Sequence, residues 1–362
     1  MKNKLHIEPD ICKAKTLHTD FYTQAHYFEL CKKKIFAQSW QFIGNKENLA
    51  QTGDIQPLTL LENYLDEPLL LTCDKEKNLH CLSNVCTHRG NLLAYTACNA
   101  RQIVCKYHGR AFDLAGNFLS MPAFQDAENF PSKTDDLTEL PLFFIHNLLF
   151  TSLQPQFPFS IFVEDMLKRI SWLPLANMKF CPHLSKTYYV KAHWALYCEN
   201  YLEGFHIPFV HQSLNEIIDY QNYSTETFAY SNLQLGIGKT GDTCFDIPNS
   251  AIDAGKQIAA YYFWVFPNMM FNFYPWGLSL NIVEPQSINK TKVSFYSYVF
   301  DESKLEQGAG TALDKVELED EEIVEHVQKG ISSCFYTQGR YSPTREQGTH
   351  HFHLLLALFL GN

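Results

Sequence analysis

Two short cysteine–histidine pairs constrain this chain more than any other feature. The first is Cys86-Thr-His88 and the second is Cys105-Lys-Tyr-His108, with sixteen residues between the pairs. Thiolates and imidazoles at such close spacing are typical of bound metal. Structural zinc sites usually space their ligands as C-x-x-C and H-x(3–5)-H, whereas each half here carries one cysteine and one histidine. The pattern therefore favours a redox metal centre over two alternatives, a zinc site and unrelated core residues.

A Rieske-type [2Fe–2S] cluster has this ligand set, with two cysteines on one iron and two histidines on the other. Gly90 and Gly109 follow the two pairs and allow tight loops that bring backbone N–H groups near the cluster sulfurs. Residues 116–122 (GNFLSMP) are expected to form a third loop that covers the cluster. The predicted cluster ligands are Cys86, His88, Cys105 and His108.

The distribution of apolar and turn-forming residues predicts a β domain that is inserted into a second domain. Between residues 40 and 150, short apolar runs alternate with Gly, Asn and Asp, which is typical of a small all-β fold. Residues 1–39 have a different pattern. Helical periodicity is continuous over 21–39, and this helix is expected to belong to the other domain. The predicted division is therefore 1–39, 40–150 and 151–362, with the [2Fe–2S] domain in the middle.

Residues 151–362 predict an antiparallel sheet flanked by helices, so the fold class is α+β. A helix is expected around 197–211, followed by loops and short helices over 212–257. The expected strands are 259–266, 270–276 and 293–300, and an acidic helix is expected over 313–332. Nine aromatic residues crowd 261–276, and one face of these strands is expected to line a cavity.

A second candidate metal site lies in the segment 199–211, ENYLEGFHIPFVH. It places His206 and His211 five residues apart, and Pro208 is expected to interrupt a helix between them. Two histidines and one carboxylate, with open positions opposite, form the site that binds non-haem Fe(II) and activates O2. The alternative is a pair of core or surface histidines that bind no metal.

The acidic helix offers the third ligand. Its apolar stripe is formed by Val316, Val324, Val327 and Ile331. Asp320 falls within that stripe, and a carboxylate on a buried face needs a positive partner, which Fe(II) would provide. The neighbouring acidic residues are expected to point into solvent: Glu319, Glu321, Glu322 and Glu325.

Composition limits the binding partners that can be expected and indicates the cellular compartment. A net charge of −10 argues against nucleic acid, because phosphate binding needs a basic surface. The first ten residues lack the apolar run of a signal peptide, and the longest apolar run, 354–360, is far shorter than the roughly 20 residues that span a bilayer. Eleven cysteines, an odd number, fit reduced thiols. We therefore expect a cytoplasmic protein without a membrane partner.

The Cys–His pairs, ENYLEGFHIPFVH and the downstream EDEEIVEHVQKG together resemble the α-subunit of Rieske non-haem iron oxygenases over essentially the whole chain. The resemblance implies a helix-grip catalytic domain and a mononuclear Fe(II) held by His206, His211 and Asp320. It places Asn200 near the iron, and it makes Glu203 the acidic residue that bridges the two metal centres. It also implies a homotrimer.

Two features of the sequence bear on the substrate. Glu203 stands where most ring-hydroxylating members have Asp, and glutamate is known there in members that oxidise quaternary ammonium compounds. The segment NYLEGFHIPFVH (residues 200–211) also resembles choline monooxygenase-like sequences. The glutamate at position 203 and this choline monooxygenase-like segment favour hydroxylation of a compound such as choline, a betaine or carnitine. The run from Tyr107 to Arg110 is a further departure, from the frequent Tyr-His-Gly-Trp.

The predicted function is thus a terminal oxygenase that uses O2 on a small organic substrate. No G-x-G-x-x-G follows a strand, so electrons must come from a separate NAD(P)H-dependent reductase or a ferredoxin. One alternative is an aromatic-ring-hydroxylating dioxygenase. A second, from another class, is a Rieske electron-transfer protein without oxygenase turnover.

Overall fold

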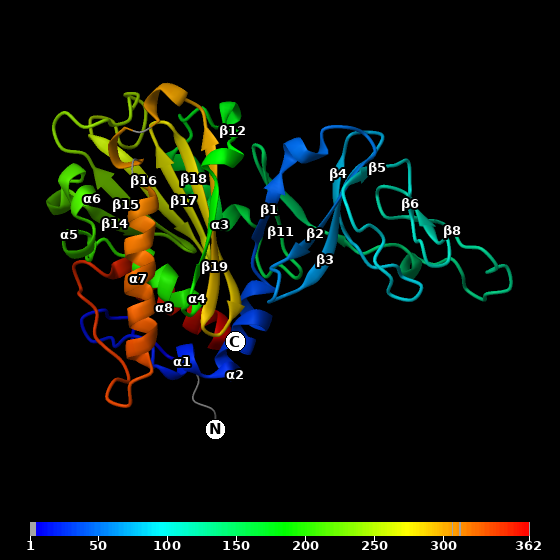
Figure 1. Cartoon of the computed structure of the whole chain (residues 1–362), viewed down its shortest axis with the longest axis horizontal. Coiled ribbons are helices and arrows are strands. Elements are labelled where there is room, and N and C mark those ends of the chain that lie inside the picture. The colour runs from blue at the N-terminus through cyan, green and yellow to red at the C-terminus, as the bar shows by residue number, and fades with distance from the viewer. Residues whose placement is uncertain (1–4, 306, 311–312, 362) are drawn as a thin grey trace. The chain divides into compact units, whose positions relative to one another are not determined.

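The computed structural model describes residues 5–305, 307–310 and 313–361. The described chain separates into two units (Figure 1). Ala37–Pro155 form one unit, the β unit, while the residues up to Phe36 and those from Gln156 onward form the other, the catalytic unit. The boundaries at 36/37 and 155/156 lie a few residues from those predicted at 39/40 and 150/151.

The β unit contains three antiparallel sheets. The first has the order β1-β11-β10, the second β5-β2-β3-β4-β9 and the third β6-β7-β8. The strands are β1 (Gln41–Asn45), β2 (Asp54–Leu60), β3 (Glu67–Cys73), β4 (Leu79–Ser83), β5 (Cys98–Asn99), β6 (Ile103–Val104), β7 (Ala111–Phe112), β8 (Phe118–Ser120), β9 (Glu139–Leu140), β10 (Leu142–Ile145) and β11 (Leu148–Thr151). The all-β prediction for this part is confirmed.

The catalytic unit is built on one antiparallel sheet with the order β12-β19-β18-β17-β16-β15-β14, in which β13 also pairs with β19. Its strands are β12 (Lys179–Phe180), β13 (Lys186–Val190), β14 (Ser224–Thr227), β15 (Ser231–Ile237), β16 (Ile258–Val265), β17 (Met269–Tyr274), β18 (Gly277–Ser287) and β19 (Lys290–Val299). Long helices accompany the sheet, and α7 runs along it as the orange ribbon in Figure 1. The α+β prediction is confirmed.

The described residues form helices of three kinds. The α-helices are α1 (Asp20–Thr23), α2 (Ala25–Cys31), α3 (Ser160–Arg169), α4 (Trp194–Tyr201), α5 (Ile207–Val210), α6 (Gln212–Ile217), α7 (Leu313–Ile331) and α8 (Gln347–Gly361). A π-helix, η1, covers Lys32–Phe36. The 3₁₀ turns are η2 (Lys46–Leu49), η3 (Lys133–Asp135), η4 (Leu175–Asn177), η5 (Pro182–Leu184), η6 (Tyr220–Asn222), η7 (Glu302–Lys304) and η8 (Gly308–Gly310). None of the described helices combines the length and the apolar character needed to cross a membrane.

Five strands of the catalytic unit were not predicted. β14 and β15 lie in the stretch 212–257, which was expected to hold loops and short helices, and no strand was predicted at β12, β13 or β18. The inner face of β15 carries Gln234 and that of β18 carries Asn281, and both side chains are buried toward a cavity. Both strands do alternate polar and apolar residues, at 232–235 (NLQL) and at 278–281 (LSLN), so the period-2 signal was present in the sequence and the prediction missed it.

The helix predicted over 21–39 is not continuous. Gln24 adopts an extended conformation between α1 and α2, and the last turn widens into the π-helix η1. Of the residues at helical spacing, Tyr22, Phe28 and Ile35 are buried, whereas His26 is exposed and Lys32 is half-buried. The periodicity therefore indicated the buried face only in part and did not show the break.

Segments from both ends of the chain meet in the core of the catalytic unit. The Phe36 ring packs edge-on against Trp194 of α4, with ring centroids 4.9 Å apart, and Trp194 packs in the same way against Phe352 of α8 at 5.8 Å. Nearby, the backbone N–H of Thr16 donates to the carbonyl of Gly339 at 3.2 Å. The N-terminal segment is thus an integral part of this unit.

Candidate metal centres and substrate cavity

The two predicted cluster pairs lie on two loops of the β unit. Each loop closes on itself: the N–H of Gly90 donates to the Cys86 carbonyl at 3.0 Å, and that of Gly109 to the Cys105 carbonyl at 2.9 Å. Both glycines have positive φ, +71° and +76°, a conformation that favours glycine. Pro122 of the predicted third loop lies against Gly109. The loops therefore hold their shape through their own backbone contacts.

The four side chains fit a two-iron cluster in type and in burial. Cys86 and Cys105 are buried in a cluster of apolar residues, while His88 and His108 are half-buried with their ring centroids 4.8 Å apart. The His108 Nδ1 atom is buried and has no hydrogen-bond partner. Two buried thiols and an orphaned imidazole nitrogen are a donor set that a Rieske cluster would satisfy.

Arg110, which departs from the family's usual tryptophan, is a buried structural residue. Its guanidinium donates to the Asp135 carboxylate at 2.6 Å and lies over the rings of Phe118 and Phe130. This contact lowers the pKa of Asp135 below its usual range, with hydrogen bonds from Arg110 first among the causes. The flat, stacked cation thus occupies a space that an aromatic ring could fill.

The two predicted iron-binding histidines flank the short helix α5. The chain leaves α4 after Tyr201, turns at Gly204 and enters α5 just after His206, and His211 follows its last residue. Pro208 was predicted to interrupt a helix, and this prediction was wrong. It sits in the first turn of α5, where a backbone N–H has no partner within the helix and its absence costs nothing. A side chain at Gly204 would clash with the Tyr223 ring, whose nearest atom would be 2.5 Å from the added carbon.

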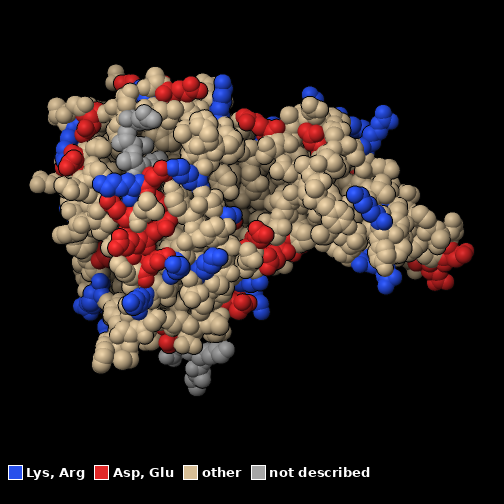
Figure 2. Space-filling model, in the orientation of Figure 1, with Lys and Arg blue, Asp and Glu red and all other residues tan. Residues whose placement is uncertain are grey.

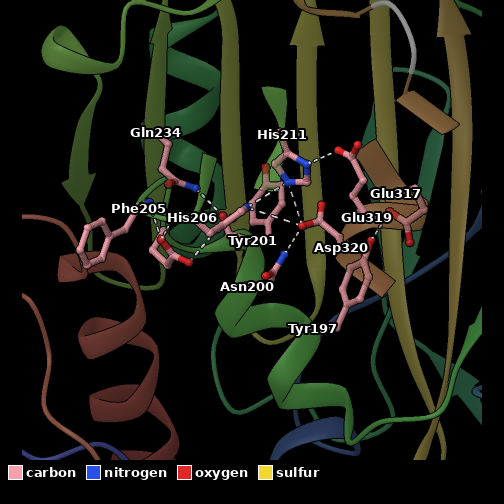
Figure 3. A network of polar contacts seen from close by, with 11 residues as sticks. Tyr197, Asn200, Tyr201, Phe205, His206, His211, Gln234, Glu317, Glu319 and Asp320 are labelled. Atoms are coloured by element: carbon pink, nitrogen blue, oxygen red, sulfur yellow. Dashed lines mark hydrogen bonds and ion pairs between the residues drawn. The ribbon is translucent and has the colours of Figure 1, made fainter. Parts of the chain in front are cut away.

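Asp320 of α7 meets both histidines at one point (Figure 3). The Nε2 atoms of His206 and His211 lie 3.2 Å apart, and Asp320 Oδ1 lies 3.0 Å from His211 Nε2 and 3.5 Å from His206 Nε2. Ligand atoms about 2.1 Å from one octahedral ion would be about 3 Å apart at adjacent positions. Within the described residues, these three form the group whose ligand atoms all lie within 4.8 Å of one another.

Carboxylates behind the rings fix their orientation. Glu203 Oε1 lies 2.7 Å from His206 Nδ1, and Glu319 Oε2 lies 2.8 Å from His211 Nδ1, so both Nε2 atoms remain free to face Asp320. The Asn200 amide donates to Asp320 Oδ1 at 2.6 Å. Several negative groups thus surround two imidazoles, a charge balance that a divalent cation would offset.

The expectation that the acidic neighbours of Asp320 point into solvent was wrong for three of them. Glu319 contacts His211, Glu325 accepts a hydrogen bond from the Lys191 backbone at 2.9 Å, and Glu321 is half-buried with a buried Oε1 atom. Val327, predicted to be on the buried stripe, is 43% exposed. The helix is rotated so that its inner face combines carboxylates with valines. Acidic side chains nevertheless gather on the outer surface along α7 (Figure 2).

A cavity of about 110 Å³, partly open to solvent, is lined in part by the three converging side chains. Five tyrosines line it: Tyr197, Tyr201, Tyr223, Tyr262 and Tyr274. Tyr262 and Tyr274 come from neighbouring strands and pack edge to face, while Phe271 and Phe273 stack with each other. One face of the aromatic stripe therefore lines the cavity, as the alternation of strand side chains implies.

Several cavity residues were not singled out in the sequence, and two of them carry polar groups that matter below. Glu317 lies three residues before Asp320 on the same face of α7, and Gln234 belongs to the unpredicted strand β15. The i, i+3 spacing from Asp320 is a signal that could have found Glu317. Nothing in the local sequence marks Gln234.

Comparison with known proteins agrees with both halves of the chain. A profile described as "Ring hydroxylating alpha subunit (catalytic domain)" matches residues 178–361, and one described as "Rieske [2Fe-2S] domain" matches 39–131. Choline monooxygenase, chloroplastic, from Arabidopsis thaliana is 29% identical and matches 95% of this chain and 82% of its own length. The carnitine monooxygenase oxygenase subunit of Escherichia coli (strain K12) is 28% identical, with 95% and 94% covered.

Solved structures share the fold. The quaternary ammonium Rieske monooxygenase CntA in complex with γ-butyrobetaine has a TM-score of 0.73 at 23% identity, with 97% of each chain covered. A naphthalene 1,2-dioxygenase variant bound to phenanthrene has a TM-score of 0.75 at 17% identity, covering 99% of this chain and 95% of the other. A [2Fe–2S] domain thus precedes a catalytic domain that binds mononuclear iron, and the protein is an oxidoreductase that incorporates O2. The chain belongs to the family of Rieske-type ring-hydroxylating α subunits.

Proposed function

We propose that this protein is the terminal oxygenase component of a system that hydroxylates a methyl or N-methyl group of a quaternary ammonium compound. The observation that carries the proposal is the convergence of His206, His211 and Asp320 beside a cavity lined by five tyrosines. The choline and carnitine monooxygenases among the relatives support the same substrate class.

We assign Cys86, His88, Cys105 and His108 to the cluster, and His206, His211 and Asp320 to the mononuclear iron. When bound, the cluster supplies single electrons and the iron activates O2. Glu203 and Glu319 hold the two imidazoles in the tautomer that leaves Nε2 free, and Asn200 fixes the Asp320 carboxylate. In this proposal the three residues orient ligands and do not themselves attack the substrate.

The tyrosine faces give the cavity its selectivity. An aromatic face attracts a quaternary ammonium group by a cation–π interaction of roughly 0.5–2 kcal/mol when the cation is desolvated. The hydroxyl of Tyr201 is occupied by the Asn272 side chain at 2.7 Å, which keeps that ring fixed. Several rings around one cation would hold its methyl groups close to the iron site.

Aromatic-ring dihydroxylation remains the second candidate, because the same rings would pack against a flat arene and the fold matches a naphthalene dioxygenase. A coupled O2-uptake screen with a surrogate reductase separates the two functions. We expect substrate-dependent uptake with choline, glycine betaine or carnitine. Uptake with aromatic acids and none with these compounds would overturn the proposal.

Iron content separates the oxygenase from a Rieske electron carrier. The oxygenase holds one iron per chain beyond the two of the cluster, and the carrier holds none.

We propose a reductase or ferredoxin as electron donor. We also propose the homotrimer that the family resemblance implies, which light scattering would detect as three times the chain mass. The eleven cysteines are all unpaired, which supports the proposed cytoplasmic location.

A further inference from the structure

The cavity has an unbalanced set of charges. Three carboxyl groups line it, from Glu203, Glu317 and Asp320, together with the two iron-site histidines. Among the described lining residues there is no lysine or arginine. A substrate carboxylate would therefore find no lysine or arginine among these side chains and could pair only with the iron itself.

Two of the three carboxyl groups already have partners. Glu203 accepts hydrogen bonds from the backbone of Phe205 and His206 and contacts the His206 ring. Asp320 contacts Asn200 and His211, and it is one of the residues assigned to the iron. Neither group needs a cation from the substrate.

Glu317 is different because half of its carboxyl group is unsatisfied. The side chain is 4% exposed, and its Oε2 atom accepts a hydrogen bond from Tyr197 at 2.6 Å (Figure 3). Its Oε1 atom is buried and has no hydrogen-bond partner. Burial raises the pKa of Glu317 well above its usual range, so a nearby cation would be needed to hold it as a carboxylate.

The lysine on the other side of Glu317 is not available to it. Lys186 lines a smaller adjoining cavity together with Glu317, but its ammonium group is paired with Asp314. Tyr188 donates to the same Asp314 carboxylate at 3.0 Å. The positive charge near this end of α7 is therefore already taken.

A second unpartnered acceptor lies in the same cavity. The Gln234 side chain is buried, and its amide Nε2 donates to the Tyr201 carbonyl at 2.6 Å, which fixes the direction of the amide. Its Oε1 atom is buried without a partner. An acceptor oxygen matches a substrate hydroxyl, which can donate a hydrogen bond, and repels a carboxylate, which cannot.

From these features we propose that Glu317 is a specificity-determining residue that recognises the positive charge of the substrate. The favoured substrate is then a quaternary ammonium cation whose remaining part is uncharged and carries a hydroxyl group, such as an amino alcohol. A quaternary nitrogen has no N–H group, so it would offset the charge of the Glu317 carboxylate electrostatically and would not donate a hydrogen bond to Oε1. This inference rests on the proposed function and narrows its substrate class.

Equilibrium binding to the anaerobic holoenzyme tests the inference without turnover. The probes are choline, glycine betaine, L-carnitine and 3,3-dimethylbutan-1-ol, an uncharged analogue of choline with a carbon in place of nitrogen. In titration calorimetry we expect wild-type protein to bind choline at least about tenfold more tightly than the other three. This comparison of the four affinities uses the wild-type protein alone, so it does not depend on whether a variant folds. Equal or tighter binding of glycine betaine or carnitine would overturn the inference.

The variant Glu317→Gln removes the charge and keeps an oxygen that Tyr197 can donate to. It should weaken choline binding by about tenfold or more and leave the uncharged analogue within about twofold. Glu322→Gln, an exposed position on the same helix, is the matched control and should change neither affinity. Unchanged choline binding in Glu317→Gln contradicts the inference, while the proposed function survives. If no ammonium compound binds or stimulates O2 uptake and an aromatic acid does, both the proposed function and this inference fail.

Discussion

The two metal-binding regions of this protein are built in different ways. The cluster loops place all four candidate ligands within residues 86–108, and each loop closes through a hydrogen bond of its own backbone. The mononuclear site brings His211 to Asp320 across 109 residues of sequence, and other side chains orient both rings. A site of the first kind depends on local turns, while one of the second kind depends on the packing of α4, α5 and α7.

The largest expected effect tests whether the two regions are independent. Cys105→Ser should abolish the Rieske absorption and EPR signals, because the cluster loses a thiolate, while the mononuclear site still takes Fe(II). Asp320→Ala should do the reverse. Iron analysis and EPR of both variants provide the measurement. Survival of the Rieske signals in Cys105→Ser would refute the ligand assignment, and loss of both metals in either variant would refute independence.

The next prediction concerns the residue proposed to connect the regions. Glu203→Gln should leave both metals bound and slow single-turnover oxidation of the cluster by about 100-fold or more, because the carboxylate that holds His206 is lost. Stopped-flow absorbance at the Rieske band follows this step. Glu203→Asp, which keeps the charge, should recover part of the rate. A wild-type rate in the Gln variant would remove Glu203 from this role.

A smaller effect is expected for Glu319, the carboxylate that orients the His211 ring. Glu319→Gln should weaken Fe(II) binding at the mononuclear site by about 10–100-fold, because the His211 ring loses a charged partner at 2.8 Å. Cluster content should not change. Competitive chelation would measure the affinity, with Glu322→Gln as the control on the same helix. Equal affinities in the two variants would mean that Glu319 does not orient the ligand.

The smallest effect belongs to the β unit alone. Burial of His80 favours its neutral form, but the hydrogen bonds that its ring donates to Glu139 at 2.8 Å and Asp74 at 3.1 Å outweigh burial and raise the pKa of His80 above its usual value. The charged ring therefore stabilises the unit fully below about pH 6.5, and this contribution is lost as the pH rises through the folded-state pKa.

Unfolding midpoints of wild-type and His80→Gln protein between about pH 5.5 and 8 would measure this contribution. The expected difference is about 1 kcal/mol or less at the acid end and shrinks toward the alkaline end. A difference that grows with pH would have the wrong sign. The iron affinity of the catalytic unit should be the same in both proteins.

Sequence reasoning worked best where the chemistry is local. The pairs at Cys86 and Cys105 could be read directly because the spacing itself identifies the ligand set. Asp320 could also be found, because a lone carboxylate among valines is conspicuous. Glu319 could not, since its role depends on how far α7 is rotated against α5. The strand β15 was missed although residues 232–235 alternate polar and apolar side chains, and hydropathy alone does not show that the polar Asn232 and Gln234 are also buried.

The packing of Phe36 against Trp194, and of Trp194 against Phe352, has a consequence for synthesis on the ribosome. The β unit can fold once residue 155 has emerged, because all of its strands are then available. The N-terminal segment must wait for α8, which is made more than 300 residues later. At roughly 5–20 residues per second this delay is about 15–60 s. During that interval Phe28, Ile35 and Phe36 have no core to enter, so this short apolar segment is where a chaperone would be expected to bind the nascent chain.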